Sequence, residues 1–182
     1  MLIDEWEKFR GWLVLEPFLE GDERIYIKEL SRKLKISPRT AQFYLDVYEK
    51  EGILEREKVG NALLYHLSDI PVVLALKRFF IILIMKDYIE NFVKQNKGIS
   101  SVVLYGSSST GEFDKRSDID LLIISQTKDL NLVKLKALEE RLGKEVKVEI
   151  LSIGEWRRLA LKKDHFYLSV VGKHTVLYGV KL

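Results

Sequence analysis

The stretch LYGSSSTGEFDKRSDIDLLIIS, from Leu104 to Ser125, constrains the fold of this chain more than any other part of its sequence. Apolar, strand-like segments stand on both sides of a turn made of small and polar residues. Asp118 and Asp120 open the second strand. Residues i and i+2 of a strand face the same side, so the two carboxylates point together and repel unless a cation lies between them. The stretch predicts an anionic site between two buried strands; an exposed strand end that happens to be acidic is the simpler alternative.

The residues around this pair predict a metal and a phosphate group. Carboxylate oxygens are hard ligands that suit Mg²⁺, which usually binds one or two carboxylates together with substrate phosphates. Gly106 lets the backbone approach a phosphate closely, and Ser107 adds a hydroxyl beside the N–H groups of the turn. On a third predicted strand, from Glu145 to Leu151, Glu149 shares a face with Lys147. Glu149 is therefore the candidate third carboxylate of a cluster that would hold two metal ions.

The run GSSSTGEFDKRSDIDLLI resembles the motif of polymerase-β-type nucleotidyltransferases, most closely their minimal members. That motif is Gly-Ser, a short helical turn with a second glycine, and then Ser-Asp-x-Asp before apolar residues. The closing segment FYLSVVGKHTVLYG also resembles the end of these domains, so the resemblance covers about residues 99–180. The motif residues that match are Gly106, Ser107, Gly111, Ser117, Asp118 and Asp120.

The resemblance implies a role for each matching residue. Asp118 and Asp120 would bind the metal ions, and a third carboxylate would position or deprotonate the acceptor. Relatives usually carry aspartate as this third residue, whereas this chain offers Glu149, with Glu145 as a rival. Together, Asp118, Asp120 and Glu149 are the predicted catalytic and metal-binding residues.

The resemblance also implies a nucleotide-binding set. Many relatives carry a basic residue directly after the first glycine, where this chain has SSST. Lys115 and Arg116 are the nearest substitutes. The predicted nucleotide-binding residues are therefore Gly106, Ser107, Ser117, Lys115 and Arg116.

The activity implied is Mg²⁺-dependent transfer of a nucleoside monophosphate from a nucleoside triphosphate, with ATP as the expected donor, to an acceptor hydroxyl. Some minimal relatives modify a partner toxin, and no acceptor-binding domain is recognised here, which favours a partner protein as acceptor. A small molecule and RNA stay open. The alternative is a nucleotide-sensing or antitoxin-like transcription regulator whose second domain turns over little or no nucleotide.

The first part of the chain has the order helix, short helix, tight turn, helix, hairpin. Residues 1 to about 20 have helical spacing, with Pro17 expected to end or kink the helix. In ISPRTAQFYLDVYEKEG, Ser37 is placed as an N-cap, Pro38 as the first helical residue and Gly52 as the stop. A Gly-Asn turn between two strand-like runs predicts the hairpin.

This order resembles a winged helix-turn-helix domain over about residues 8–68, in which the helix after the turn enters the major groove of DNA. That places residues 38–50 in the recognition role. The predicted DNA-reading residues are Arg39, Thr40, Gln42 and Phe43, with Arg32, Lys33 and Lys35 near phosphates. A protein-interaction module is the alternative, because winged helices also serve in dimerisation.

PVVLALKRFFIILIMKDYIENFVKQNKG predicts a long helix from Pro71 to about Asn96 that is apolar nearly all round in its first half. We expect that half to be buried, with Ile82 and Leu83 in the core, against a neighbouring domain or a second copy in a homodimer. The predicted fold class is α/β (α+β): a winged helix-turn-helix over residues 1–70, a connecting helix over 71–97, and a polymerase-β-like nucleotidyltransferase fold with a small mixed sheet over 98–182.

Composition and charge limit the partners and the cellular location that we expect for these domains. The net charge of +3 is too mild to argue for nucleic acid by itself, and the absence of cysteine excludes disulfides and thiolate metal sites. The sequence begins with an acidic, mixed segment rather than a signal peptide, and its most apolar run is interrupted by Lys77 and Arg78. We therefore expect a cytoplasmic protein that does not cross a membrane.

Overall fold

The computed structural model describes residues 9–21 and 24–181, and these form two compact units, residues 1–77 and 78–182, considered separately below. Predicted structure for residues 1–8 lies outside the described part. None of the helices in the described ranges is long and apolar enough to cross a membrane.

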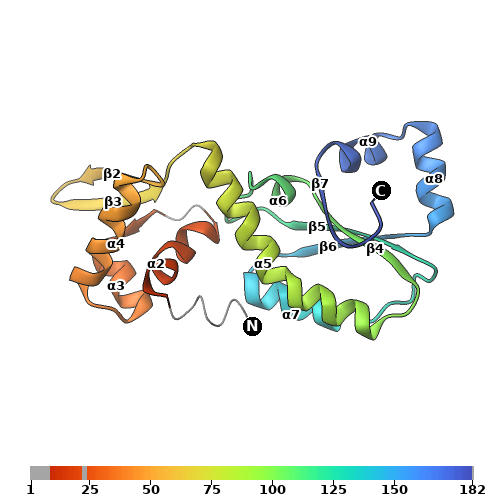
Figure 1. The fold of residues 1–182 in the computed structure, drawn as a ribbon, viewed down its shortest axis with the longest axis horizontal. Helices are drawn as coiled ribbons and strands as arrows, with labels where there is room; N and C mark the ends of the chain where they lie inside the picture. The colour runs from red at the N-terminus through yellow and green to blue at the C-terminus, as the bar shows by residue number, and fades with distance from the viewer. Residues whose placement is uncertain (1–8, 22–23, 182) are drawn as a thin grey trace. The chain divides into compact units, whose positions relative to one another are not determined.

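The first unit consists of helices around a small antiparallel sheet (Figure 1). The chain runs through α2 (Arg10–Leu19), β1 (Ile25–Tyr26), α3 (Ile27–Leu34), α4 (Pro38–Lys50), β2 (Leu54–Val59) and β3 (Ala62–Leu67). The strands are ordered β1-β3-β2, and β2 and β3 form the predicted hairpin. Phe18, Leu30, Leu45 and Tyr65 are fully buried at its centre. The expected order of elements is therefore present, with β1 as an additional edge strand beside the hairpin.

Local signals explain where α4 begins and ends. The hydroxyl of Ser37 accepts a hydrogen bond from the Thr40 N–H at 3.0 Å, and Pro38 follows as the first helical residue. Gly52, at φ +72°, follows the helix end as expected. Pro17 does not end the helix: α2 continues through this residue to Leu19. The alternative expectation, a kink at Pro17, stays a prediction. Pro17 lies eight positions into the helix, and its buried ring helps to fill the core of the unit.

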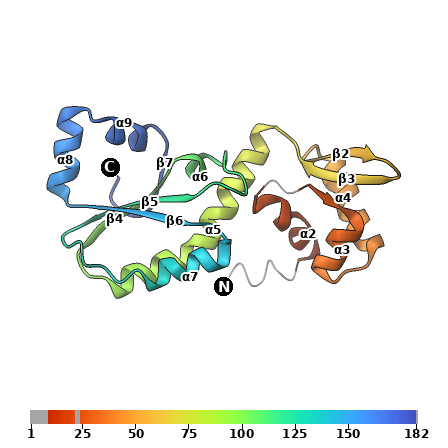
Figure 2. The ribbon, with the colours of Figure 1, turned by 180° about the vertical axis from the view of Figure 1, so that it is seen from behind.

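The second unit is a mixed four-stranded sheet with helices on both faces (Figures 1 and 2). Its elements after α5 (Pro71–Gln95) are β4 (Ile99–Tyr105), α6 (Ser107–Thr110), β5 (Ile119–Ser125), α7 (Val133–Leu142), β6 (Val146–Leu151), α8 (Ile153–Lys162), α9 (His165–Gly172) and β7 (His174–Gly179). The strand order is β6-β5-β4-β7; β4 is antiparallel to both neighbours, and β5 is parallel to β6. The α/β class and the small mixed sheet are confirmed.

One face of this sheet packs under α8 and α9, and the other lies towards α7 and the second half of α5 (Figure 2). Val103, Leu122, Ile124, Leu151 and Val170 form the core under α8 and α9, and Tyr105, Trp156, Leu159, Phe166 and Val176 pack against it. Side chains alternate along each strand, so Asp120 and Tyr105 lie on this same face. The predicted carboxylate site therefore stands where the α8/α9 core gives way to polar residues.

Burial along α5 follows a stripe rather than the whole circumference. Val72 is 48% exposed and Phe79 is 42% exposed, so the first half of α5 is not buried all round within the single chain. Burial of the exposed side against a second copy stays a prediction. Ile82 and Leu83 are only half-buried, and the fully buried positions fall on their neighbours. The buried side of the helix carries Val73, Lys77, Phe80, Ile81, Ile84, Met85, Ile89 and Phe92. A continuous apolar run cannot reveal which side of a helix is buried, because all sides of the helix carry apolar residues.

The buried stripe predicts that the same substitution lowers the free energy of unfolding by different amounts at two adjacent positions. Ile81→Val should lower the free energy of unfolding by about 1 kcal/mol, because a methyl group is removed from a filled core. Ile82→Val should cost less than half of that, because its side chain is half-buried. Urea unfolding of both variants and the parent measures the difference. Equal losses at the two positions would contradict the stripe.

Candidate functional site

A row of four residues crosses the sheet of the second unit at one end. Tyr105 lies opposite Asp120 on β5 and opposite His174 on β7, and Asp120 lies opposite Lys147 on β6. Residues directly opposite each other in neighbouring strands share a face and lie close together. The row therefore gathers an imidazole, a phenol, a carboxylate and an ammonium group at the edge of the core beneath α9.

Gly106 places the backbone against the Asp120 carboxylate. Its φ of +69° and ψ of −157° lie in a region open almost only to glycine. A Cβ atom at this position would lie 2.8 Å from Oδ2 of Asp120. The single turn α6 follows directly and ends at Gly111, which has φ +89°. The predicted phosphate turn and the predicted metal ligand therefore lie close together, with no room for a side chain between them.

Hydroxyl groups fix the shape of this turn. Oγ of Ser109 lies 2.7 Å from the Gly106 carbonyl oxygen and 3.0 Å from that of Lys173, just before β7. The Ser108 hydroxyl donates to the carbonyl oxygen of Asp118 at 3.2 Å. Within the described part of the chain, the Ser107 hydroxyl has no such partner. Ser107 is thus the serine of the turn that is left for a ligand.

The two aspartates have different surroundings. Burial raises the pKa of Asp120 above its ordinary value; nearby Lys147 lowers it, and Asp118 raises it again. Oδ2 of Asp118 lies 2.5 Å from Nζ of Lys147 in an ion pair. The pKa of Lys147 is raised, mainly by its hydrogen bond to Asp118. Sequence reasoning placed Lys147 on the face of Glu149 and gave it no role.

Glu149 lies opposite Leu122, two residues along β6 from Lys147, and is exposed. It faces the site side of the sheet, and its charge helps to raise the pKa of Tyr105, after burial and Asp120. Among the described residues, no three His, Cys, Asp or Glu side chains gather closely enough to hold a metal ion. The expected cluster of three carboxylates is therefore not assembled among these residues: Lys147, and not Glu149, lies opposite Asp120. Glu145, its rival, is exposed before β6.

The site still fits Mg²⁺ through its two aspartates. Both present hard oxygen ligands, and the raised pKa of Asp120 reflects desolvation and repulsion by Asp118. A divalent cation relieves both effects. Their assignment as metal ligands, and that of Glu149, stays a prediction.

The loop before β5 is held by its own polar groups. Oδ1 of Asp114 accepts hydrogen bonds from the N–H groups of Arg116 and Ser117 and from the Ser117 hydroxyl, at 2.8–2.9 Å. The Ser117 hydroxyl is the largest cause of the lowered pKa of Asp114. Ser117 therefore shapes the loop, whereas Lys115 and Arg116 are exposed on it. The role of these three residues in nucleotide binding stays a prediction.

The predicted DNA-reading residues of α4 divide into two pairs. Arg39 is exposed, and Phe43 is 61% exposed with its ring edge-on to Tyr44. Thr40 and Gln42 are engaged within the unit: the Thr40 hydroxyl lies 2.8 Å from that of Ser37, and the Gln42 amide donates to Asp46 and to the Tyr65 hydroxyl. The residues expected near phosphates, Arg32, Lys33 and Lys35, are exposed on and after α3.

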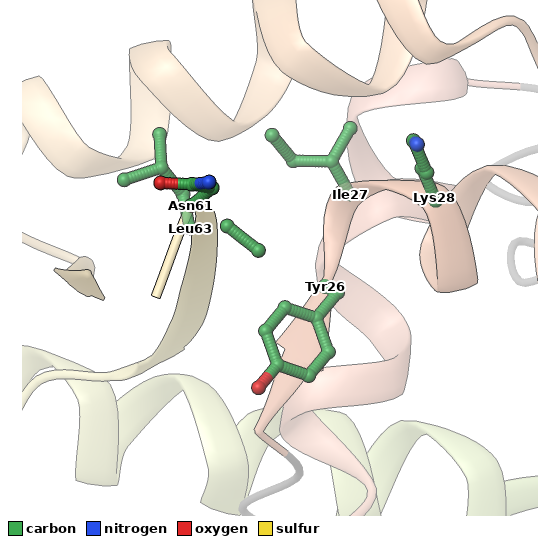
Figure 3. Close-up of a pocket in the computed structure, with 6 residues that line it drawn as sticks. Tyr26, Ile27, Lys28, Asn61 and Leu63 are labelled. Carbon is green, nitrogen blue, oxygen red and sulfur yellow. The ribbon is translucent and has the colours of Figure 1, made fainter. Parts of the chain in front are cut away.

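Two hollows lie in the first unit. One, of about 470 Å³, is lined by Tyr26 and Ile27 on one side and by Asn61 and Leu63 on the other (Figure 3). The second, of about 580 Å³, lies between α3 and the start of α4 and includes Arg32 and Pro38. The first contains none of the predicted DNA-reading residues, and the second contains only Arg32.

Part of the second unit is similar to a known protein family. Residues 86–169, from within α5 to within α9, match the family model described as nucleotidyltransferase domain. The matched stretch includes the predicted phosphate turn and both aspartates. No curated protein sequence matches the chain.

Two solved structures show weak similarity. One is a toxin–antitoxin structure with AMP-PNP: the match has 19% identity and a TM-score of 0.37, and covers 53% of this chain and 74% of that one. The other is a protein from Sulfolobus solfataricus described as a candidate nucleotidyltransferase: it has 23% identity and a TM-score of 0.31, and covers 44% of this chain and 75% of that one.

Proposed function

We propose that the second unit transfers a nucleoside monophosphate from a nucleoside triphosphate, with ATP as the expected donor, to an acceptor hydroxyl. The acceptor oxygen bonds to the α-phosphorus, the bond from that phosphorus to the bridging oxygen breaks, and pyrophosphate leaves. The observation that carries the proposal is the close approach of the Asp120 carboxylate to Gly106, where it occupies the space that a side chain would need. It joins a turn suited to phosphate with a ligand suited to Mg²⁺.

Each residue of the site has a separate role in this proposal. The backbone of the turn and the Ser107 hydroxyl bind the phosphates, with Lys115, Arg116 and the Ser117 loop beside them. Asp118 and Asp120 hold Mg²⁺, with Glu149 towards a second ion. Glu149 also takes the acceptor proton and passes it to water, since it is exposed on the same face. When bound, Mg²⁺ supplies charge neutralisation for the triphosphate and the leaving pyrophosphate.

The test is incubation of the protein with labelled ATP, CTP, GTP or UTP and Mg²⁺, with cell extract as the source of acceptors. The expected result is label on a protein or other acceptor that depends on Mg²⁺ and is lost with EDTA. Label from one nucleotide alone identifies the donor. If no nucleotide yields label, the transferase proposal fails.

We propose that the first unit is a winged helix-turn-helix domain that binds DNA. Support comes from the order of its elements, the hairpin after α4, and the exposure of Arg39 and Phe43 at the start of that helix. Because Thr40 and Gln42 are held within the unit, Arg39 and Phe43 are the expected readers of base edges. Arg32, Lys33 and Lys35 would contact phosphates.

Arg39→Ala should weaken binding to promoter fragments by about 1–3 kcal/mol and relax sequence preference, because a base-edge contact is lost. Lys50→Ala, which removes one charge at the far end of α4, serves as the matched control and should change affinity little. Gel shifts at fixed salt compare the variants. If the intact protein binds no DNA at low salt across a genomic fragment pool, the unit is an interaction module instead.

A second candidate function is a cytoplasmic, antitoxin-like regulator that senses nucleotide without transferring it. The ion pair of Lys147 with Asp118 favours it, because the pair occupies a carboxylate that the transferase needs. Tight Mg²⁺-dependent binding of ATP with no label transfer would select this function. The expected partner is a protein acceptor for the transferase and a toxin for the regulator. The exposed side of α5, with Val72 and Phe79, is the surface proposed for a homodimer.

A further inference from the structure

We infer that Lys147 couples metal binding to triphosphate binding: its ammonium group holds Asp118 in the metal-free protein and moves to the phosphates when metal and triphosphate bind together. The inference rests on the proposed function and adds a residue that neither the motif nor the family match assigns.

The contacts of Lys147 place it between the two ligands. Its Nζ pairs with Oδ2 of Asp118, and its backbone lies directly opposite Asp120. The Asp120 carboxylate in turn lies against Gly106 at the start of the phosphate turn. A phosphate on that turn would therefore lie beside Asp120, the residue directly opposite Lys147 in the neighbouring strand.

The lysine is also able to move. Its side chain is 53% exposed, against 34% for Asp118, so the ammonium group can swing through solvent without disturbing the core. The charged groups that act on it are Asp118, Glu145 and Asp120. All three groups are carboxylates. A phosphate is also negatively charged, so it can replace a carboxylate as the partner of the ammonium group.

Competition for Asp118 follows from these positions. An ammonium group and a metal ion cannot both bind Oδ2 closely, because like charges repel. A metal ion arriving alone must displace Lys147 and then tolerate it nearby. A triphosphate arriving with the metal brings oxygens that accept the displaced ammonium group, so the two ligands favour each other's binding.

The experiment measures Mn²⁺ binding by the electron paramagnetic resonance signal of free Mn²⁺, with and without a non-hydrolysable α,β-methylene ATP. For Lys147→Met, Mn²⁺ alone should bind about 2–5-fold more tightly than to the parent, as expected for loss of an exposed competing ion pair. With the analogue present, the variant should bind Mn²⁺ at least about 10-fold less tightly, because a charge-assisted contact to phosphate is lost. Lys147→Arg should keep the coupling.

Lys136→Met, an exposed lysine on α7, is the matched control and should behave like the parent. Melting curves of the metal-free proteins confirm that the variants are folded. If Lys147→Met leaves Mn²⁺ binding unchanged, or weakens it equally with and without the analogue, the coupling role is wrong. If the parent itself binds no Mn²⁺ in the presence of the analogue, the proposed function fails rather than the role of Lys147.

Discussion

Replacing Asp118 and Asp120 together with asparagine is expected to abolish Mg²⁺-dependent nucleotide transfer, with a loss of about a thousand-fold or more. Amides cannot neutralise a metal ion while charge builds on the leaving pyrophosphate. The double variant should also lose metal-dependent binding of a non-hydrolysable triphosphate, measured by calorimetry with and without Mg²⁺. The fold should survive, because neither side chain is part of the core.

The matched control is Asp69→Asn with Asp129→Asn, which removes two exposed carboxylates outside the site. It should retain activity and metal-dependent binding. The stability of the Asp118/Asp120 variant should change little, because Lys147 already offsets part of the repulsion between the two aspartates. We expect its melting temperature to stay within about 4 °C of the parent. If the double variant binds the metal–triphosphate complex as tightly as the parent does, the site lies elsewhere.

Gly106→Ala should both destabilise the protein and impair the site. The backbone at φ +69° and ψ −157° is strained for any residue with a Cβ atom, at a cost of about 1–3 kcal/mol. The new Cβ atom would meet Oδ2 of Asp120 at 2.8 Å, so the carboxylate must turn away from the turn. We expect a lower melting temperature and at least about tenfold weaker metal-dependent triphosphate binding.

Gly143→Ala separates strain from contact. Gly143 ends α7 at φ +61°, and no atom lies within 4 Å of the position of its Cβ. This variant should lose about 1 kcal/mol of stability and keep triphosphate binding, because only the left-handed backbone is strained. If both variants bind triphosphate equally well, the contact between Gly106 and Asp120 has no functional role.

Elements with local signals were predicted well from the sequence. The start of α4 follows from Ser37 and Pro38, whose capping and fixed φ act within one turn of chain. The strands β4, β5 and β6 follow from short apolar runs between turn residues. The turn over residues 106–111 follows from Gly106 and Gly111, and its role in phosphate binding stays a prediction. In each case, the physical cause lies within a few residues of the element it determines.

Features that depend on distant parts of the chain were not predicted. Lys147 pairs with Asp118 because β6 lies parallel to β5 in a register that places Lys147, and not Glu149, opposite Asp120. A shift by two residues keeps the same face, so the alternation of the sequence cannot choose between these registers. Tyr105 escaped notice for the same reason, since its neighbours come from β5 and β7. The half-buried Ile82 shows the same limit in a helix, because the apolar sequence of α5 does not indicate which side of the helix faces the core.

The attachment of the phosphate turn to β7 bears on when the site can form during synthesis. Ser109 bonds to the carbonyl oxygen of Lys173, 64 residues later, and Thr175 reaches back to the Ser109 carbonyl oxygen at 3.4 Å. A ribosome adds about 5–20 residues per second, so the turn waits several seconds for these anchors after its own residues have been made. Until β7 has left the exit tunnel, the turn beside the two aspartates lacks its hydrogen bonds to Lys173 and Thr175. The turn beside the two aspartates therefore gains its attachment to β7 only after nearly the whole of the second unit has been translated.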